Sequence, residues 1–157
     1  MIRETQEQAN WCWAACVRMA ASHFGMPAPE QCTLASEFIP GAVACCIDGS
    51  TDACDQSLDA AAIPALYKAV ILFADALGSD ALPVTEPMVR NALANGIVLL
   101  LLNLRTSFHF ILVDDFVTNQ FQVTDPKYIK PFLTDWSTIN QAYGLGNIEE
   151  SWHIRPR

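Results

Sequence analysis

The first part of the chain carries apolar residues at the spacing of an α-helix. After a polar opening segment, apolar side chains recur every three or four positions, at Trp13, Val17, Ala20 and Phe24. Asn10 can cap the start of such a helix, and Gly25 is a residue type common just past a helix end. The pattern therefore predicts a helix over residues 11–24.

Two further helices are predicted before the chain changes character. Pro64 suits the first turn of a helix, because its missing N–H would have no helical partner there, and a helix over residues 64–77 follows. Thr85 suits the start of another helix, which Gly96 ends. Helical patterning is thus confined to the part of the chain before residue 96.

The second part of the chain has the shorter apolar runs that are typical of β-strands. Residues 97–102 are uninterrupted apolar and predict a buried central strand. Further strand-like runs follow at residues 109–116, 120–123 and 151–155, and Thr118-Asn119 predicts a hairpin turn between the first two. The predicted fold class is α+β, in one domain with a helical lobe over about residues 1–95 and a sheet lobe over about residues 96–157.

Composition and charge narrow the function classes. The chain has 157 residues, 52% of them hydrophobic and 17% charged, which is enough to fill the core of one domain. Its net charge of −8 repels phosphate backbones and anionic lipid, so we expect no nucleic-acid partner. The longest apolar run is far below the roughly 20 residues that span a bilayer, so we expect no membrane insertion. The opening residues lack a secretory signal, which fits a trimmed domain or export without such a signal.

All the cysteines lie within the first 54 residues, and the segment 26–57 lacks both helical and strand periods. We expect this segment to be irregular and joined by disulfides among Cys32, Cys45, Cys46 and Cys54, which indicates an oxidising final compartment. Two pairings are open, 32–45 with 46–54 and 32–46 with 45–54. The first is favoured because it closes a short second loop. A zinc site is the weaker alternative, because the segment has no C-x-x-C pair.

Cys12 is the candidate nucleophile. If the first helix begins at Trp11, Cys12 lies in its first turn, where unpaired N–H groups and the helix dipole favour a thiolate. Cys16 would lie in the middle of the helix, where a buried thiol is usually inert. The alternative is that both are core residues or disulfide partners, although a bond between them would distort the helix.

A nucleophilic thiol needs a base, and the chain has three histidines. His23 lies on the same helix as Cys12 and, at about 1.5 Å per residue, is too far along the axis to reach it. His109 begins a strand, and Asp125 follows one hairpin later, so neighbouring strands could bring imidazole and carboxylate together. His153 has no acidic residue after it and ranks second.

Acyl transfer also requires a hydrogen-bond donor for the developing oxyanion. A glutamine amide just before the helix could serve, beside the backbone N–H of Cys12. Gln6 and Gln8 both qualify on their chemistry, so the residues alone leave this choice open.

The spacing of Gln6 and Cys12-Trp13 resembles the Q-x5-C-W arrangement of papain-like cysteine peptidases. Further segments follow in the order of the compact bacterial branch of that superfamily: "QANWCWAAC", "CCIDGSTDAC", "HFILVDD" and "VTDP". That branch includes plant-pathogen effector peptidases and the peptidase domains that process bacteriocin precursors. The similarity runs from about Gln6 to Trp152.

The resemblance implies a role for each candidate residue. Cys12 would be the nucleophile and His109 the acid/base. Asp125 would orient His109, and Gln6 would donate to the oxyanion. Trp13 would pack beneath the site, and the helical lobe would pack on an antiparallel sheet. The chain departs from its relatives where they have a glycine-aromatic pair, since it has Asp115-Phe116 there. Asp114 or Asp115 is therefore a weaker alternative acid.

We therefore expect a papain-like cysteine protease, a hydrolase that cleaves peptide bonds in a protein or peptide substrate without a metal or organic cofactor. The resemblance further implies a secreted or translocated bacterial effector or toxin that acts as a monomer. A cognate inhibitor or immunity protein in the producing cell would be its natural partner. Two alternatives are another thiol acyl transfer (deamidation, transglutamination or removal of a ubiquitin-like tag) and a catalytically silent protein-binding module.

Overall fold

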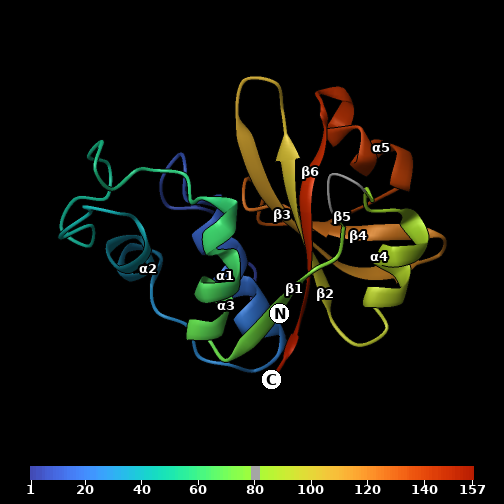
Figure 1. Cartoon of the computed structure of the whole chain (residues 1–157), viewed down its shortest axis with the longest axis horizontal. Coiled ribbons are helices and arrows are strands. Elements are labelled where there is room, and N and C mark those ends of the chain that lie inside the picture. The colour runs from blue at the N-terminus through green and yellow to red at the C-terminus, as the bar shows by residue number, and fades with distance from the viewer. Residues whose placement is uncertain (79–81) are drawn as a thin grey trace.

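In the computed structural model, which describes residues 1–78 and 82–157, six strands form one antiparallel sheet in the order β1-β6-β2-β3-β4-β5. The strands are β1 (Leu72–Ala76), β2 (Ile97–Asn103), β3 (Phe108–Val117), β4 (Gln120–Thr124), β5 (Phe132–Thr134) and β6 (Asn147–Pro156). The helices on one side are α1 (Cys12–His23), α2 (Gln31–Phe38) and α3 (Ile63–Ala69), and those on the other are α4 (Glu86–Ala92) and α5 (Trp136–Asn140) (Figure 1). The predicted α+β class is confirmed. None of the helices in the described part of the chain is both long and apolar enough to cross a lipid bilayer.

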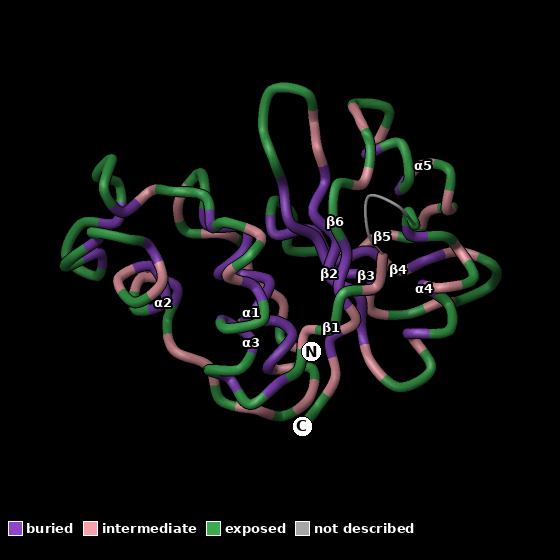
Figure 2. The backbone as a smooth tube through the Cα atoms, in the orientation of Figure 1, coloured by how far each residue is buried: buried purple, intermediate pink, exposed green. Residues whose placement is uncertain are grey.

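Strand β2 lies inside the sheet and is buried on both faces. Its odd-numbered residues from Ile97 to Leu101 pack into a core with α1, and its even-numbered residues from Val98 to Leu102 pack into a second core on the opposite face. Because side chains alternate between the two faces of a strand, a strand covered on both faces needs an uninterrupted apolar run. Figure 2 shows burial concentrated in the central strands and in α1. The predicted central strand is confirmed.

The hairpin of β3 and β4 is present where the sequence predicts it. Thr118 and Asn119 both have positive φ, 50° and 64°, as a two-residue type I′ turn requires. Leu112 of β3 pairs with Thr124 of β4, and Asp125 follows directly after β4. The hairpin therefore returns Asp125 to the neighbourhood of the first residues of β3, which include His109.

The helix predicted over residues 64–77 is wrong in its second half. Helix α3 ends at Ala69, Ile71 has a φ of 64°, and residues 72–76 form β1, which pairs with β6. The left-handed backbone at Ile71 ends the helical course and allows the chain to turn back along the sheet. The apolar run around this residue is compatible with either period, so local pattern did not separate helix from strand. The sheet thus begins before the lobe boundary predicted near residue 95.

The segment 26–57 is more ordered than the sequence suggests. It contains helix α2, and its disulfides are Cys32–Cys46 and Cys45–Cys54, so the favoured pairing was wrong. The structural reason is that neighbouring cysteines face opposite ways. Cys45 and Cys54 are buried in the core beside α1, whereas Cys46 is exposed and reaches Cys32 on α2.

Candidate active site

Cys12 is the first residue of α1, in the helix-start position that the sequence predicts. Trp11 is the residue before the helix, and no side chain caps the first turn. The predicted cap at Asn10 is wrong, because the Asn10 amide donates to the backbone oxygen of Asp55, and its backbone N–H donates to the Asp55 carboxylate. N–H groups of the first turn have no acceptors within the helix, and together with the helix dipole they favour negative charge on the Cys12 sulfur.

The two tryptophans that flank Cys12 fasten the helix start to the disulfide-bonded loop. Both rings are 1% exposed. The Trp11 indole N–H donates to the carbonyl oxygen of Cys54 at 2.8 Å, and the Trp13 indole N–H donates to that of Gln56 at 3.1 Å. The loop also packs so closely that a Cβ on Gly49 would lie 2.6 Å from the Trp11 ring. The two tryptophans therefore have a structural role, because they hold Cys12 in position at the start of the helix.

His109 and Asp125 form a buried pair beside Cys12. The distance from His109 Nε2 to Asp125 Oδ1 is 2.7 Å, and the side chains are 7% and 2% exposed. The same Asp125 oxygen accepts the backbone N–H of Lys127 at 2.8 Å, which holds the carboxylate in place. With Nε2 directed at Asp125, Nδ1 is the ring nitrogen left to exchange a proton with Cys12.

The protonated form of His109 is favoured in this setting. Burial lowers the pKa of His109, but the hydrogen bond to Asp125 and the interaction with the Cys12 side chain outweigh it and raise the pKa to about 9. An imidazole that stays protonated at neutral pH can stabilise a neighbouring thiolate. His109 thus places a positive charge beside the Cys12 sulfur at neutral pH.

The backbone of Phe110, the residue after His109, contacts both free cysteines. Its N–H donates to Cys12 Sγ at 3.4 Å, and its carbonyl oxygen accepts the thiol of Cys16 at 3.5 Å. Cys16 is fully buried, and this burial raises the pKa of the Cys16 thiol well above its usual value. Cys16 therefore packs helix α1 on strand β3, which sets the distance between Cys12 and His109. The sequence reasoning missed Phe110, although its place next to the candidate histidine was a signal.

Gln6 lies near the pair but its amide is already engaged. Its backbone N–H donates to the carbonyl oxygen of Pro126 at 2.9 Å, which brings the residue next to Asp125. Its side-chain Nε2 donates to the carbonyl oxygens of Gln8 and Ala9 at 3.0 and 2.6 Å, whereas Oε1 is buried without a partner in the described part of the chain. These acceptors fix which way the amide points. To bind an oxyanion, Gln6 would have to release one of them.

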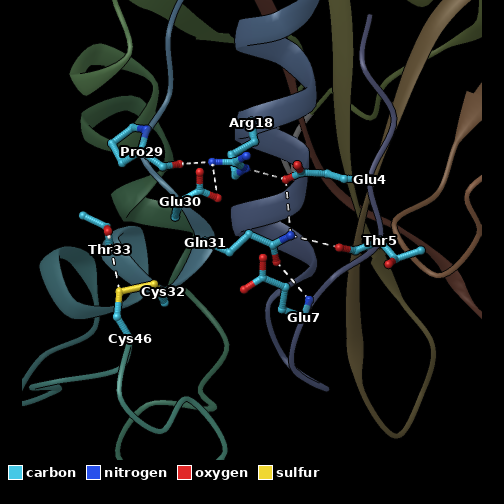
Figure 3. A network of polar contacts seen from close by, with 10 residues as sticks. All are labelled: Glu4, Thr5, Glu7, Arg18, Pro29, Glu30, Gln31, Cys32, Thr33 and Cys46. Atoms are coloured by element: carbon cyan, nitrogen blue, oxygen red, sulfur yellow. Dashed lines mark hydrogen bonds and ion pairs between the residues drawn. A yellow bond between two sulfur atoms is a disulfide. The ribbon is translucent and has the colours of Figure 1, made fainter.

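A polar network anchors the segment that carries Gln6 to helices α1 and α2 (Figure 3). Gln31 is 1% exposed, accepts the backbone N–H of Glu7, and donates to the carboxylate of Glu4 and the carbonyl oxygen of Thr5. Arg18 of α1 also pairs with Glu4, at 2.7 Å. The network positions the start of the chain beside the site. Nothing in the local sequence distinguished Gln31 from an ordinary surface glutamine.

The remaining candidates lie elsewhere. His23 ends α1 and packs edge-on against Phe24, with ring centroids 4.7 Å apart, and His153 lies in β6 opposite Val98 of β2. Asp114 receives hydrogen bonds from Arg3, Gln122 and Thr124, and Asp115 accepts the N–H of Phe116. Of the acids considered, Asp125 is therefore the one that the structure places on His109.

The thiol and the imidazole open onto different cavities. Cys12 and Trp13 line a cavity of about 240 Å³, and His109 and Asp125 line another of about 300 Å³ together with Tyr143. Because Cys12 and His109 interact, an extended peptide that lies across them would reach both cavities. In the described residues, no group of three or more histidine, cysteine or acidic side chains is arranged to hold a metal ion. The arrangement offers a nucleophile, a proton carrier and an orienting carboxylate.

No family model and no curated protein matches the chain. Among solved structures it is similar to the crystal structure of the N-terminal peptidase C39 like domain of the toxin secretion ATP-binding protein from Vibrio parahaemolyticus. The TM-score is 0.55 over 98% of this chain and 100% of that domain, with 10% sequence identity. At this identity the similarity concerns the fold and not a branch of the superfamily. The chain thus has the fold of the papain-like cysteine peptidases, as its sequence predicts.

Proposed function

We propose that this protein is a cysteine peptidase that hydrolyses peptide bonds in a protein substrate. Cys12 is the nucleophile, His109 the acid/base and Asp125 the residue that orients His109. The observation that carries the proposal is the His109–Asp125 hydrogen bond of 2.7 Å, buried beside a thiol at the start of a helix. A histidine with only a packing role in a strand would need neither a carboxylate bonded to one ring nitrogen nor a cysteine beside the other.

The chemistry follows from these positions. Before the substrate binds, His109 Nδ1 already carries the proton given up by the Cys12 thiol, and the thiolate sulfur attacks the substrate carbonyl carbon. The imidazolium then gives its proton to the leaving amine, which departs and leaves a thioester on Cys12. A water molecule, deprotonated by His109, attacks the thioester and releases the carboxylic acid and the free thiol. Asp125 keeps the ring in one orientation and stabilises its protonated form throughout.

The developing oxyanion needs donors on the same side of the thiol. The backbone N–H of Cys12 belongs to the first turn of α1, where it has no acceptor within the helix. Gln6 is the second donor in this proposal, and one of its Nε2 hydrogen bonds to the turn at residues 8–9 exchanges for the substrate oxygen. A Gln6→Glu variant keeps the size of the side chain but removes the donors. Its kcat should fall, whereas its KM should change little.

The compartment of action is proposed to lie outside the reducing cytosol. The disulfides Cys32–Cys46 and Cys45–Cys54 join the loop that the tryptophans beside the site hold in place to α2 and to itself, and such bonds persist in oxidising surroundings. The similar solved domain belongs to a toxin secretion protein. We propose a secreted or translocated effector or toxin domain, with a cognate inhibitor in the producing cell.

The test is a comparison of proteomes treated with the wild type and with Cys12→Ala. New amino termini that appear with the wild type and not with Cys12→Ala would support peptidase activity. Cys16→Ala removes a thiol that packs α1 on β3 but is not the nucleophile, so it should reduce the number of new termini without abolishing them. If the treated proteins instead show glutamine converted to glutamate, or cross-links, without new amino termini, the reaction is another acyl transfer and not hydrolysis of peptide bonds. Equal action of wild type and Cys12→Ala would refute the catalytic assignment.

A further inference from the structure

The cavity beside Cys12 has apolar walls and an acidic rim. Its walls include Trp13, Leu58, Leu101, Phe108 and Phe110, and its volume is about 240 Å³. The acidic residues that line it, Asp59, Glu149 and Glu150, are all exposed. No lysine, arginine or histidine is among its lining residues in the described part of the chain.

The backbone of β6 is irregular where it supplies two of these acids. Leu101 of β2 pairs with Glu150, whereas the next residue of β2, Leu102, pairs with Ile148, so Glu149 is an extra residue in β6. Successive side chains on a regular strand point to opposite faces, but a bulge redirects one of them. Consecutive glutamates therefore line the same cavity. Bulges that re-aim a side chain are frequent beside active sites.

The third acid comes from a different segment of the chain and is held by its own turn. Asp59 accepts the N–H of Ala61 at 2.9 Å and so begins the short 3-10 helix Ala60–Ala62. The residues just before it are tied to the active site, because the carbonyl oxygen of Gln56 accepts the indole N–H of Trp13. Acidic groups from two separate segments thus line a cavity that is also lined by Cys12.

We infer that this cavity selects a basic side chain, lysine or arginine, at the first or second residue before the peptide bond that is cleaved. This inference rests on the proposed peptidase function and gives it a substrate class. Lysine and arginine combine an apolar stem with a charged head, so the stem suits walls such as Leu101 and Phe110, and the head suits the acidic rim. The aromatic walls add attraction for the cation when the ring faces it.

The charge distribution across the site agrees with this assignment. Among the residues that the structure describes, the cavity on the His109 side is lined by Lys127 and by no acid other than Asp125, whose carboxylate is hydrogen-bonded to His109. A basic side chain is therefore attracted to the Cys12 side and not to the other. The net charge of −8 also raises the rate at which basic peptides approach the protein.

The experiment measures how fast Cys12 is labelled by peptidyl acyloxymethyl ketones that differ in one residue. One series varies the first residue before the ketone and the other varies the second, and in each the varied residue is arginine, norleucine or glutamate. Labelling is followed by the intact mass of the protein. In one series, we expect the arginine probe to label the wild type fastest and the glutamate probe slowest. The double variant Glu149→Gln/Glu150→Gln should label with the arginine probe about tenfold more slowly, since two exposed ion pairs are lost. Its rate with the norleucine probe should not change.

The matched control is Glu37→Gln/Asp52→Asn, which removes the same number of charges from exposed positions that do not line the cavity. It should leave the arginine rate unchanged. Equal rates for the arginine and glutamate probes in both series, or an arginine preference that survives in Glu149→Gln/Glu150→Gln, would overturn the inference while leaving the peptidase proposal standing. Failure of all probes to label Cys12 would instead overturn the peptidase proposal, and the inference with it.

Discussion

Replacing Asp125 by asparagine should remove most of the pH dependence of stability that His109 creates. In the wild type, burial lowers the pKa of His109, and the hydrogen bond to Asp125 and the interaction with Cys12 raise it to about 9 from an ordinary value of 6.5. Asparagine fits the same space but carries no charge. In Asp125→Asn the pKa of His109 should therefore fall back toward its ordinary range, because the negative charge that counteracts the lowering by burial is gone.

The magnitude follows from linkage. The pKa of His109 is higher in the folded protein, so its contribution to the free energy of unfolding is fully present below about pH 6.5 and is lost as the pH rises through about 9. One pKa unit corresponds to about 1.4 kcal/mol, so the wild type should lose about 3 kcal/mol of stability from His109 over this window. The loss in Asp125→Asn should be at most about 1 kcal/mol.

The assay is urea unfolding at several pH values between 6 and 9.5, with the His109 titration followed by NMR. Asp114→Asn is the matched control, because Asp114 is a carboxylate with a side chain 4% exposed that pairs with Arg3 rather than with a histidine. The difference between the wild type and this control should not change from pH 6.5 to pH 9. An Asp125→Asn protein whose stability falls with pH as steeply as the wild type would refute the reasoning.

Other consequences concern the supports around the site. Replacing the Cys45–Cys54 pair by serine should lower the free energy of unfolding by about 3 kcal/mol and also lower kcat/KM; replacing the Cys32–Cys46 pair should cost similar stability with a smaller loss of kcat/KM, because only the first pair lies in the core beside α1. Gln31→Ala should lower stability by about 2 kcal/mol in urea unfolding, since it leaves buried polar partners unpaired. Trp13→Phe should cost about 2 kcal/mol by the same measurement, because it removes both the indole donor to Gln56 and the buried volume of the five-membered ring.

The sequence predicts those parts of the fold in which a single local pattern dominates. Residues 97–102 are apolar without interruption, which suits only a strand buried on both faces or a buried helix, and their short length favours the strand. Thr118-Asn119 specifies a tight hairpin on its own. That hairpin is also what makes the pairing of His109 with Asp125 predictable, because it fixes how far β4 returns along β3.

Other parts depend on partners that lie far away in the sequence. Strand β1 forms because β6, about 80 residues later, offers it an edge, and the apolar residues around Ile71 suit a helix equally well. The disulfide pairing depends on which of Cys45 and Cys46 faces the core, which no loop length specifies. Gln31 and the bulge at Glu149 belong to the same class, since their roles come from tertiary contacts alone.

The most direct test of the proposed active site is the rate at which iodoacetamide alkylates Cys12 at pH 6, measured by peptide mapping in the wild type and in His109→Ala. His109 is protonated at this pH, and the proposal has it stabilise a thiolate on Cys12, so the wild type should react at Cys12 and not at the fully buried Cys16. His109→Ala should react at least about tenfold more slowly, since a thiol without such help is almost fully protonated there. Equal rates in the two proteins would contradict a thiolate formed with His109, and with it the assignment of Cys12 as the nucleophile.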